Sequence, residues 1–253
     1  NMEDATMKVK MTGTGSILCS SLSASALIDE RIQIDVPNGY CKKMRLDNVD
    51  LDRLDVVVLT HFHGDHYFDI PFLLLELGMT EGRTSPLRIF GPKGVEARVR
   101  ELHGYAFSNW DKVVRNAKVE FNEFPEGWFE VPTREGTYEI LAKRVEHGTE
   151  DAYGLMVRRE GRTVGYTSDS CFCESIAEIV AVSDLVVLDV SFPQDSAAHM
   201  GLESASRIVG NPANQGKVFV ATHMTDDVRN APPVDRLITP DDGDVFCVGD
   251  QQK

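Results

Sequence analysis

Four residues with metal-binding side chains lie within one six-residue segment of the chain. The segment reads His61-Phe62-His63-Gly64-Asp65-His66. It follows Val56–Thr60, an apolar run that predicts a buried strand. His61 and His63 alternate in extended backbone and can point the same way, whereas Asp65 and His66 come after a tight turn that Gly64 permits. This split arrangement favours two metal ions lying close together.

The alternative explanation for this segment is an ordinary polar loop or a helix cap. The whole chain has only seven histidines, and three of them fall within these six residues. Such a concentration is too improbable for a loop without chemistry. The sequence therefore predicts a metal site between this strand and the next helix.

The elements that must position this site alternate along the chain. Apolar runs bounded by turn residues predict strands in both halves, at 8–12, 24–29, 32–36, 56–60, 88–90, 118–124, 138–145, 152–158, 163–168, 185–190 and 217–222. Helices are expected at 67–79, from the turn at 91–94 through His103, at 174–182 and at 202–209. Strands with helices between and after them suggest two packed sheets with helices on the outside. The stretch 103–136 is expected to form loops near the site mouth. Its aromatic side chains are expected to pack the core, with covering of a substrate base as the alternative.

The histidine segment resembles the HxHxDH signature of the metallo-β-lactamase superfamily. Three further residues match this family in order along the chain. His147 stands where the family supplies a third histidine, Asp169 where it has a bridging aspartate, and His223 where it has the final ligand. The resemblance spans roughly residues 7–246 and implies an α/β fold, the four-layer αββα sandwich.

The resemblance also implies which residues bind each metal ion. One ion would be held by His61, His63, His147 and Asp169, and the other by Asp65, His66, Asp169 and His223. Imidazole and carboxylate ligands without thiolate suit Zn²⁺, with Mn²⁺ and Fe as alternatives. The two ions would activate a hydroxide for attack on an electrophilic centre. We expect Asp65 and His199 to be the catalytic residues and no organic cofactor to be bound.

His199 distinguishes between branches of the superfamily. The segment Ala198-His199-Met200-Gly201 resembles the histidine motif of ribonuclease Z and of related small phosphodiesterases, although Met200-Gly201 departs from the usual residues. In that branch the histidine lies over the metal pair. It could donate a proton to a leaving alcohol or stabilise charge on phosphate oxygens. The resemblance thus implies a phosphodiesterase.

Charge and spacing favour a small or cyclic phosphodiester over a long nucleic acid. Lys and Arg number 26 against 40 Asp and Glu, a net charge of −14, whereas nucleic acids are usually bound by a basic face. In ribonuclease Z an arm that grips tRNA lies between the third histidine and the bridging aspartate. Here only 22 residues lead from His147 to Asp169. That is room for two strands and a turn, and none for an arm.

Two other functions remain open at this point. A lactone or thioester hydrolase would use the same metals, and a non-enzymatic member of the fold would serve as a binding or sensing module. No repeat or Pro/Gly/Ser-rich linker divides the chain, so we expect one domain over residues 1–253. We also expect a cytoplasmic protein with reduced thiols and no membrane contact. The resemblance makes a homodimer an expectation.

Overall fold

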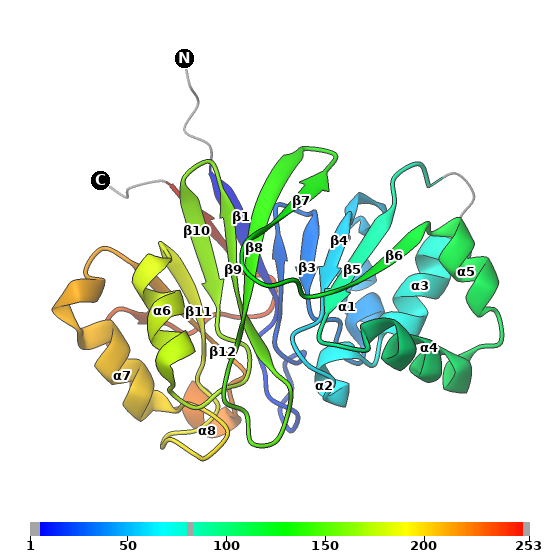
Figure 1. Cartoon of the computed structure of the whole chain (residues 1–253). Coiled ribbons are helices and arrows are strands. Elements are labelled where there is room, and N and C mark those ends of the chain that lie inside the picture. The colour runs from blue at the N-terminus through cyan, green and yellow to red at the C-terminus, as the bar shows by residue number, and fades with distance from the viewer. Residues whose placement is uncertain (1–5, 80–82, 250–253) are drawn as a thin grey trace.

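Two seven-stranded sheets form the centre of the protein (Figure 1), in a computed structural model that describes residues 6–79 and 83–249. The strands of the first sheet, in spatial order, are β14 (Val245–Val248), β1 (Met7–Gly13), β2 (Ser25–Ile28), β3 (Ile32–Ile34), β4 (Val56–Val58), β5 (Leu87–Gly91) and β6 (Val119–Glu123). Those of the second are β13 (Leu237–Ile238), β12 (Val218–Thr222), β11 (Leu185–Asp189), β10 (Arg162–Tyr166), β9 (Tyr153–Arg159), β8 (Gly136–Arg144) and β7 (Phe129–Thr133).

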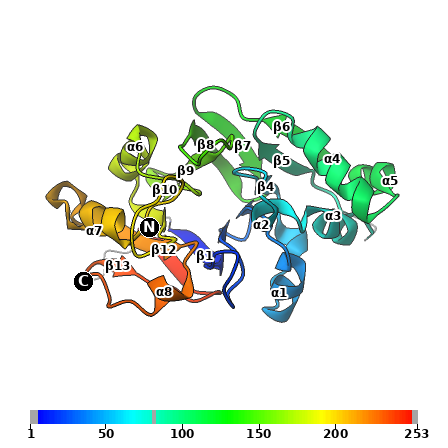
Figure 2. The same ribbon diagram turned by 90° about the horizontal axis from the view of Figure 1, so that it is seen from below.

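Helices cover the outer faces of both sheets, which the view from below in Figure 2 shows as two separate groups. The group beside the first sheet comprises α1 (Tyr40–Leu46), α2 (Gly64–Tyr67), α3 (Ile70–Met79), α4 (Val95–Ala106) and α5 (Trp110–Asn116). The group beside the second comprises α6 (Glu174–Val182), α7 (Leu202–Gly210) and α8 (Asp226–Arg229). Short 3₁₀ turns lie at Leu51–Arg53 and Pro212–Asn214. The predicted αββα sandwich is confirmed.

Three apolar clusters explain why the chain forms these layers. One lies between the sheets, where side chains such as Val9, Ile34 and Val187 are fully buried. A second joins the first sheet to α1, α3 and α4, and a third joins the second sheet to α6 and α7. Because each central strand buries both faces, it reads as a continuous apolar run such as β4 or β11.

Parallel strand pairing brings the chemically important segments to one edge of the sandwich. β3, β4, β5 and β6 run parallel to one another, and so do β10, β11, β12 and β13. β8 and β10 each pair antiparallel with β9, so they share one direction. In open α/β sheets the carboxyl ends of strands form the crevice where ligands bind. Here the segments after β4, β8, β10, β11 and β12 carry the predicted site residues.

The stretch 103–136 corrects one expectation. It holds α5, β6 and β7 rather than loops alone. Trp110 stacks on Phe121 at 5.7 Å, and Phe129 stacks on Phe90 against the core between the sheets. Core packing therefore explains these aromatics.

All five cysteines lie in the described ranges and are free thiols. Within those ranges, no helix is long and apolar enough to cross a bilayer.

Candidate metal centre

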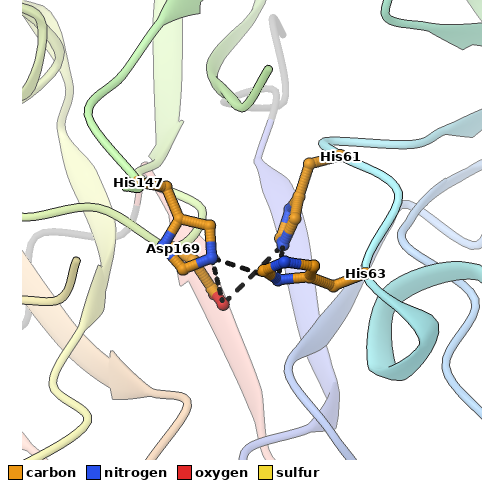
Figure 3. Close-up of side chains that lie close together, drawn as sticks. All are labelled: His61, His63, His147 and Asp169. Atoms are coloured by element: carbon orange, nitrogen blue, oxygen red, sulfur yellow. Dashed lines mark hydrogen bonds and ion pairs between the residues drawn. The ribbon is translucent and has the colours of Figure 1, made fainter. Parts of the chain in front are cut away.

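The first predicted ligand set is assembled at one edge of the sandwich, from the segments that follow β4, β8 and β10. His61, His63, His147 and Asp169 offer ligand atoms that all lie within 4.8 Å of one another, and Figure 3 shows them turned toward a common point. Nδ1 of His63 is 3.2 Å from Nε2 of His61 and 3.1 Å from Nε2 of His147. Two segments separated by more than eighty residues thus converge on one point.

The second predicted ligand set lies directly beside the first. Asp65, His66 and His223 form a group of the same kind, and all three are buried. Oδ2 of Asp65 is 3.5 Å from Nε2 of His66 and 3.4 Å from Nε2 of His223. Among the described residues, these three atoms are buried without any hydrogen-bond partner. Because unpartnered buried polar atoms are costly, a cation at this point would account for them.

Asp169 lies between the two sets, as a bridging ligand would. Its Oδ2 is 3.2 Å from Nε2 of His66 and 3.1 Å from Nε2 of His223. The same oxygen is 3.9 Å from Nε2 of His61 and 3.8 Å from Nε2 of His147. One carboxylate therefore faces imidazoles of both sets.

Each histidine in these two sets has one ring nitrogen that faces away from the cluster, the outer nitrogen, and this nitrogen contacts another protein group. The other ring nitrogen, which faces the cluster, is therefore the one available to bind a cation. Nδ1 of His61 lies 3.0 Å from Oγ1 of Thr60, and Nδ1 of His147 lies 2.8 Å from the carbonyl of Ala198. The other outer contacts are His66 Nδ1 to Asp35 Oδ2 at 2.8 Å, His223 Nδ1 to Ser191 Oγ at 2.8 Å, and His63 Nε2 to Glu150 Oε1 at 3.5 Å. Such outer partners are typical of metal-binding histidines. The donor set thus fits divalent cations.

Asp35 is a supporting residue that sequence reasoning missed. It is fully buried, with a backbone φ of 58° at the end of β3. Its carboxylate accepts hydrogen bonds from the Thr60 backbone N–H and hydroxyl, both at 2.8 Å, in addition to His66. Ser168 and His223 also have positive φ, at 57° and 56°. Such backbone is uncommon for residues other than glycine and gathers at functional sites. No short motif marks Asp35, since its partners lie 25 and 31 residues away.

His199 lies over the second ligand set. Its ring stacks on that of His223 at 5.0 Å and meets the His147 ring at 4.8 Å. Its Nδ1 lies 2.9 Å from Oδ2 of Asp189, and because a carboxylate can only accept, Nδ1 is the donor. Ser191 donates from Oγ to the other oxygen of Asp189 at 2.5 Å. Asp189 therefore orients His199 directly and His223 through Ser191. No motif in the sequence marked Asp189, at the end of β11, as a residue that supports the site.

The loop carrying His199 is tied down on both sides. Met200 is fully buried, its N–H donates to Ser170 O at 2.8 Å, and its carbonyl accepts from Ser191 N at 3.0 Å. A Cβ on Gly201 would lie 2.6 Å from backbone atoms of Gln194 and Phe192. The unusual Met200-Gly201 pair thus has a packing explanation: one residue anchors the loop, and the other lets two chain segments approach closely.

The charges at the centre favour binding of cations. Burial lowers the pKa of His61 well below its usual value, and the neighbouring His66 adds to this effect. Burial also opposes charge on His66, but Asp169 and Asp35 outweigh it and raise its pKa well above the usual value. For Asp169, burial is outweighed by His223 and His66, so its pKa lies well below the ordinary one. The carboxylates thus hold protons on nearby imidazoles, and bound cations would replace those protons.

Two histidines open the centre to solvent. The His63 side chain is 41% exposed and that of His199 is 16% exposed. The remaining predicted ligands are 8% exposed or less. A substrate would therefore approach from the side of His63 and His199. His199 also forms a group with Asp169 and His223 whose ligand atoms lie within 4.8 Å.

Comparison with known proteins places this site in a family. A family model described as a beta-lactamase superfamily domain matches residues 30–224, a range that includes all seven predicted ligands and His199. The chain belongs to the metallo-β-lactamase superfamily. Among its relatives, ribonuclease Z of Methanosarcina mazei is 26% identical, over 88% of this chain and 90% of that enzyme. Ribonuclease Z of Clostridium beijerinckii is 32% identical over 119 residues, 44% of this chain but only 38% of that enzyme.

Solved structures share the fold of this superfamily member over nearly its whole length. The metallo-beta-lactamase fold protein YhfI from Bacillus subtilis has a TM-score of 0.74 at 21% identity, covering 96% of this chain and 99% of its own. The short form of human tRNase Z has a TM-score of 0.73 at 18% identity, covering 95% and 99%. A diphosphatase from the PhnP family has a TM-score of 0.69 at 17% identity, covering 95% and 97%. These structures show the shared fold, whereas the family match and the ribonuclease Z relatives indicate a metal-dependent hydrolase of the ribonuclease Z-like branch.

Proposed function

We propose that this protein hydrolyses small or cyclic phosphodiesters with two divalent ions, Zn²⁺ in the first instance. The observation that carries the proposal is the position of His199. Its imidazole stacks on His223 without being needed to complete either predicted ligand set, and its Nδ1 is committed to Asp189 at 2.9 Å. A group placed in this way suits a reaction in which a leaving alkoxide needs a proton.

The proposed ligands are the two sets described above, with Asp169 shared. When bound, the ions would act as Lewis acids toward the phosphate and would activate a water molecule for attack. Asp189 would keep the Nδ1 proton of His199 in place, so that Nε2 carries the proton given to the leaving oxygen. Asp65 is the second proposed catalytic residue, because its unpartnered buried Oδ2 can orient an attacking water as well as bind a cation.

The proposed substrate is small because of the short segment between two ligands and the negative charge at the mouth of the centre. The segment between His147 and Asp169 is filled by β9 and β10, which are joined by the short turn Glu160–Gly161. Glu150 lies beside the exposed His63, and the whole chain carries a net charge of −14. Negative charge at the mouth would repel a nucleic acid backbone. The ribonuclease Z relatives make precursor tRNA the substrate that most needs testing.

The proposed function is tested with a substrate panel on protein loaded with Zn²⁺ or Mn²⁺. The panel contains bis(4-nitrophenyl) phosphate, cyclic nucleotides, an acyl-lactone and a thioester. We expect turnover of the phosphodiesters above that of the acyl compounds. The reverse order would favour a lactone or thioester hydrolase, and no turnover with less than one ion per chain would favour a binding module.

His199→Ala separates the proposed acid from a bystander. The variant should keep two ions and the fold, while kcat for a diester with a poor alkoxide leaving group falls by about 10²–10⁴-fold. The loss should shrink for nitrophenolate, which leaves without a proton. Equal losses for both leaving groups would point to stabilisation of phosphate oxygens instead, and loss of an ion would make His199 a ligand.

A further inference from the structure

Phe192 is a large aromatic side chain that remains 40% exposed beside His199. The two ring centroids are 5.8 Å apart and their planes are nearly perpendicular, at 81°. Within the described ranges, the other rings in contact with His199 belong to His147 and His223, two proposed metal ligands. Single exposed apolar residues are ordinary on protein surfaces. Phe192 is distinguished from such residues because it contacts His199, the proposed proton donor.

The backbone under Phe192 is held rigidly, so the exposed ring has a defined position. Its carbonyl accepts from Leu202 N at 2.9 Å, and it pairs with Gly201 in a short β-bridge. Asp195, in the same loop, accepts from the N–H of Gly201 at 2.9 Å and from the N–H and hydroxyl of Ser204 at 3.1 and 2.6 Å. The loop is thereby fastened to the start of α7. A ring on such a backbone can form a preorganised wall of a binding site.

We propose that Phe192 forms a subsite for the leaving group and selects phosphodiesters whose leaving oxygen carries a flat apolar group, such as an aryl ring. The inference rests on the proposed function. If His199 protonates the leaving oxygen, the carbon bound to that oxygen must lie next to the His199 ring. Among the described residues, Phe192 is the phenyl ring in contact with the His199 ring, and aromatic rings pack well in offset or perpendicular arrangements.

The chemistry of the step is an ordinary hydrolysis. A water oxygen forms the new bond to phosphorus, and the electrons of the broken P–O bond stay with the leaving oxygen. His199 gives its proton to that oxygen, and the proton released by the attacking water replaces the one that His199 has lost. Phe192 takes no part in proton transfer. It positions the leaving group against His199.

The test compares two diesters that share a methyl group and differ in the leaving group. Methyl phenyl phosphate carries a flat ring, whereas methyl hexafluoroisopropyl phosphate carries a branched aliphatic group of similar leaving ability. For Phe192→Ala loaded with Zn²⁺, we expect kcat/KM to fall by about 2- to 10-fold with the phenyl ester and to change little with the aliphatic ester. Phe192→Tyr keeps the ring and should retain the preference.

Phe172 provides a matched control, because it is also exposed, at 51%, and lines a separate cavity between α6 and α7. Phe172→Ala should leave both rates unchanged. Equal losses for both esters in Phe192→Ala, with a shifted pH profile, would mean that Phe192 only packs against His199, and the subsite would be wrong. Unchanged rates, or turnover of bis(4-nitrophenyl) phosphate but of neither methyl ester, would also overturn it. If wild-type protein with two ions hydrolyses no diester, the proposed function itself fails.

Discussion

Replacing Asp189 by asparagine removes a charge while nearly preserving shape. The Asp189 carboxylate is fully buried and accepts from His199 Nδ1 at 2.9 Å, from Ser191 Oγ at 2.5 Å and from Ser170 N at 3.0 Å. Asparagine offers one acceptor oxygen in place of two. Because His199 and Ser170 share one carboxylate oxygen and Ser191 uses the other, at least one of these donors meets an amide N–H. The variant also loses the negative charge that stabilises protonated His199.

The expected loss follows from these contacts. A hydrogen bond to a charged group contributes about 1.5–3 kcal/mol, and each 1.36 kcal/mol corresponds to about tenfold in rate. We therefore expect kcat to fall by about 10- to 100-fold for a diester with a poor alkoxide leaving group. The loss with a nitrophenolate leaving group should be smaller.

The assay measures steady-state rates with both leaving groups on protein of known metal content. Ser191→Ala serves as the comparison. It removes the contact to His223 Nδ1 at 2.8 Å and a longer contact to His199 Nδ1 at 3.1 Å, but it leaves the charged contact between Asp189 and His199 at 2.9 Å. Ser191→Ala should weaken metal binding, and its loss of rate should be similar with both leaving groups. If Asp189→Asn keeps full activity, or loses it equally with both leaving groups, the role given to Asp189 is wrong.

Three further predictions address the metal ions, the loop and RNA. Asp169→Ala should bind at most one ion per chain and lose activity while still unfolding cooperatively, because the fold has its own cores; full metal content with near-normal turnover in the variant would contradict the bridging assignment. Gly201→Ala should lower kcat with metal content unchanged, because its Cβ would lie 2.6 Å from the backbone of Gln194 and Phe192 and overpacking costs about 1–3 kcal/mol; an unchanged rate would show that the loop tolerates the shift. Precursor tRNA should bind weakly and be cleaved poorly. Efficient 3′-end cleavage that survives moderate salt would show that neither the net negative charge nor the missing arm excludes tRNA as a substrate.

The sequence predicted the layers and the clustering of the site residues for identifiable physical reasons. Buried strands such as β4 and β11 are continuous apolar runs, and His61 to His66 are close in the chain, so local patterns were sufficient. The family resemblance supplied His147, Asp169 and His223, which the structure brings to the same edge. Their roles as ligands remain proposals.

The features that the sequence did not predict depend on contacts between distant segments. Asp35 faces His66 across 31 residues, and Asp189 faces His199 from the end of another strand. Neither carboxylate lies in a short motif. The helix α1 was missed because its seven residues, Tyr40–Leu46, include two lysines and an arginine, and only Tyr40, Cys41 and Met44 are buried. The contacts within the chain do not test three further expectations. The single domain, the homodimer and the cytoplasmic location therefore remain predictions.

We have proposed that the seven clustered residues hold two divalent ions that together hydrolyse a phosphodiester. The most direct test titrates metal-free protein with Zn²⁺ and follows hydrolysis of bis(4-nitrophenyl) phosphate at each step. We predict that the rate rises and levels off when two ions are bound per chain. A rate that reaches its maximum with one ion bound, or that stays at background with two bound, would show that the protein is not a two-ion phosphodiesterase.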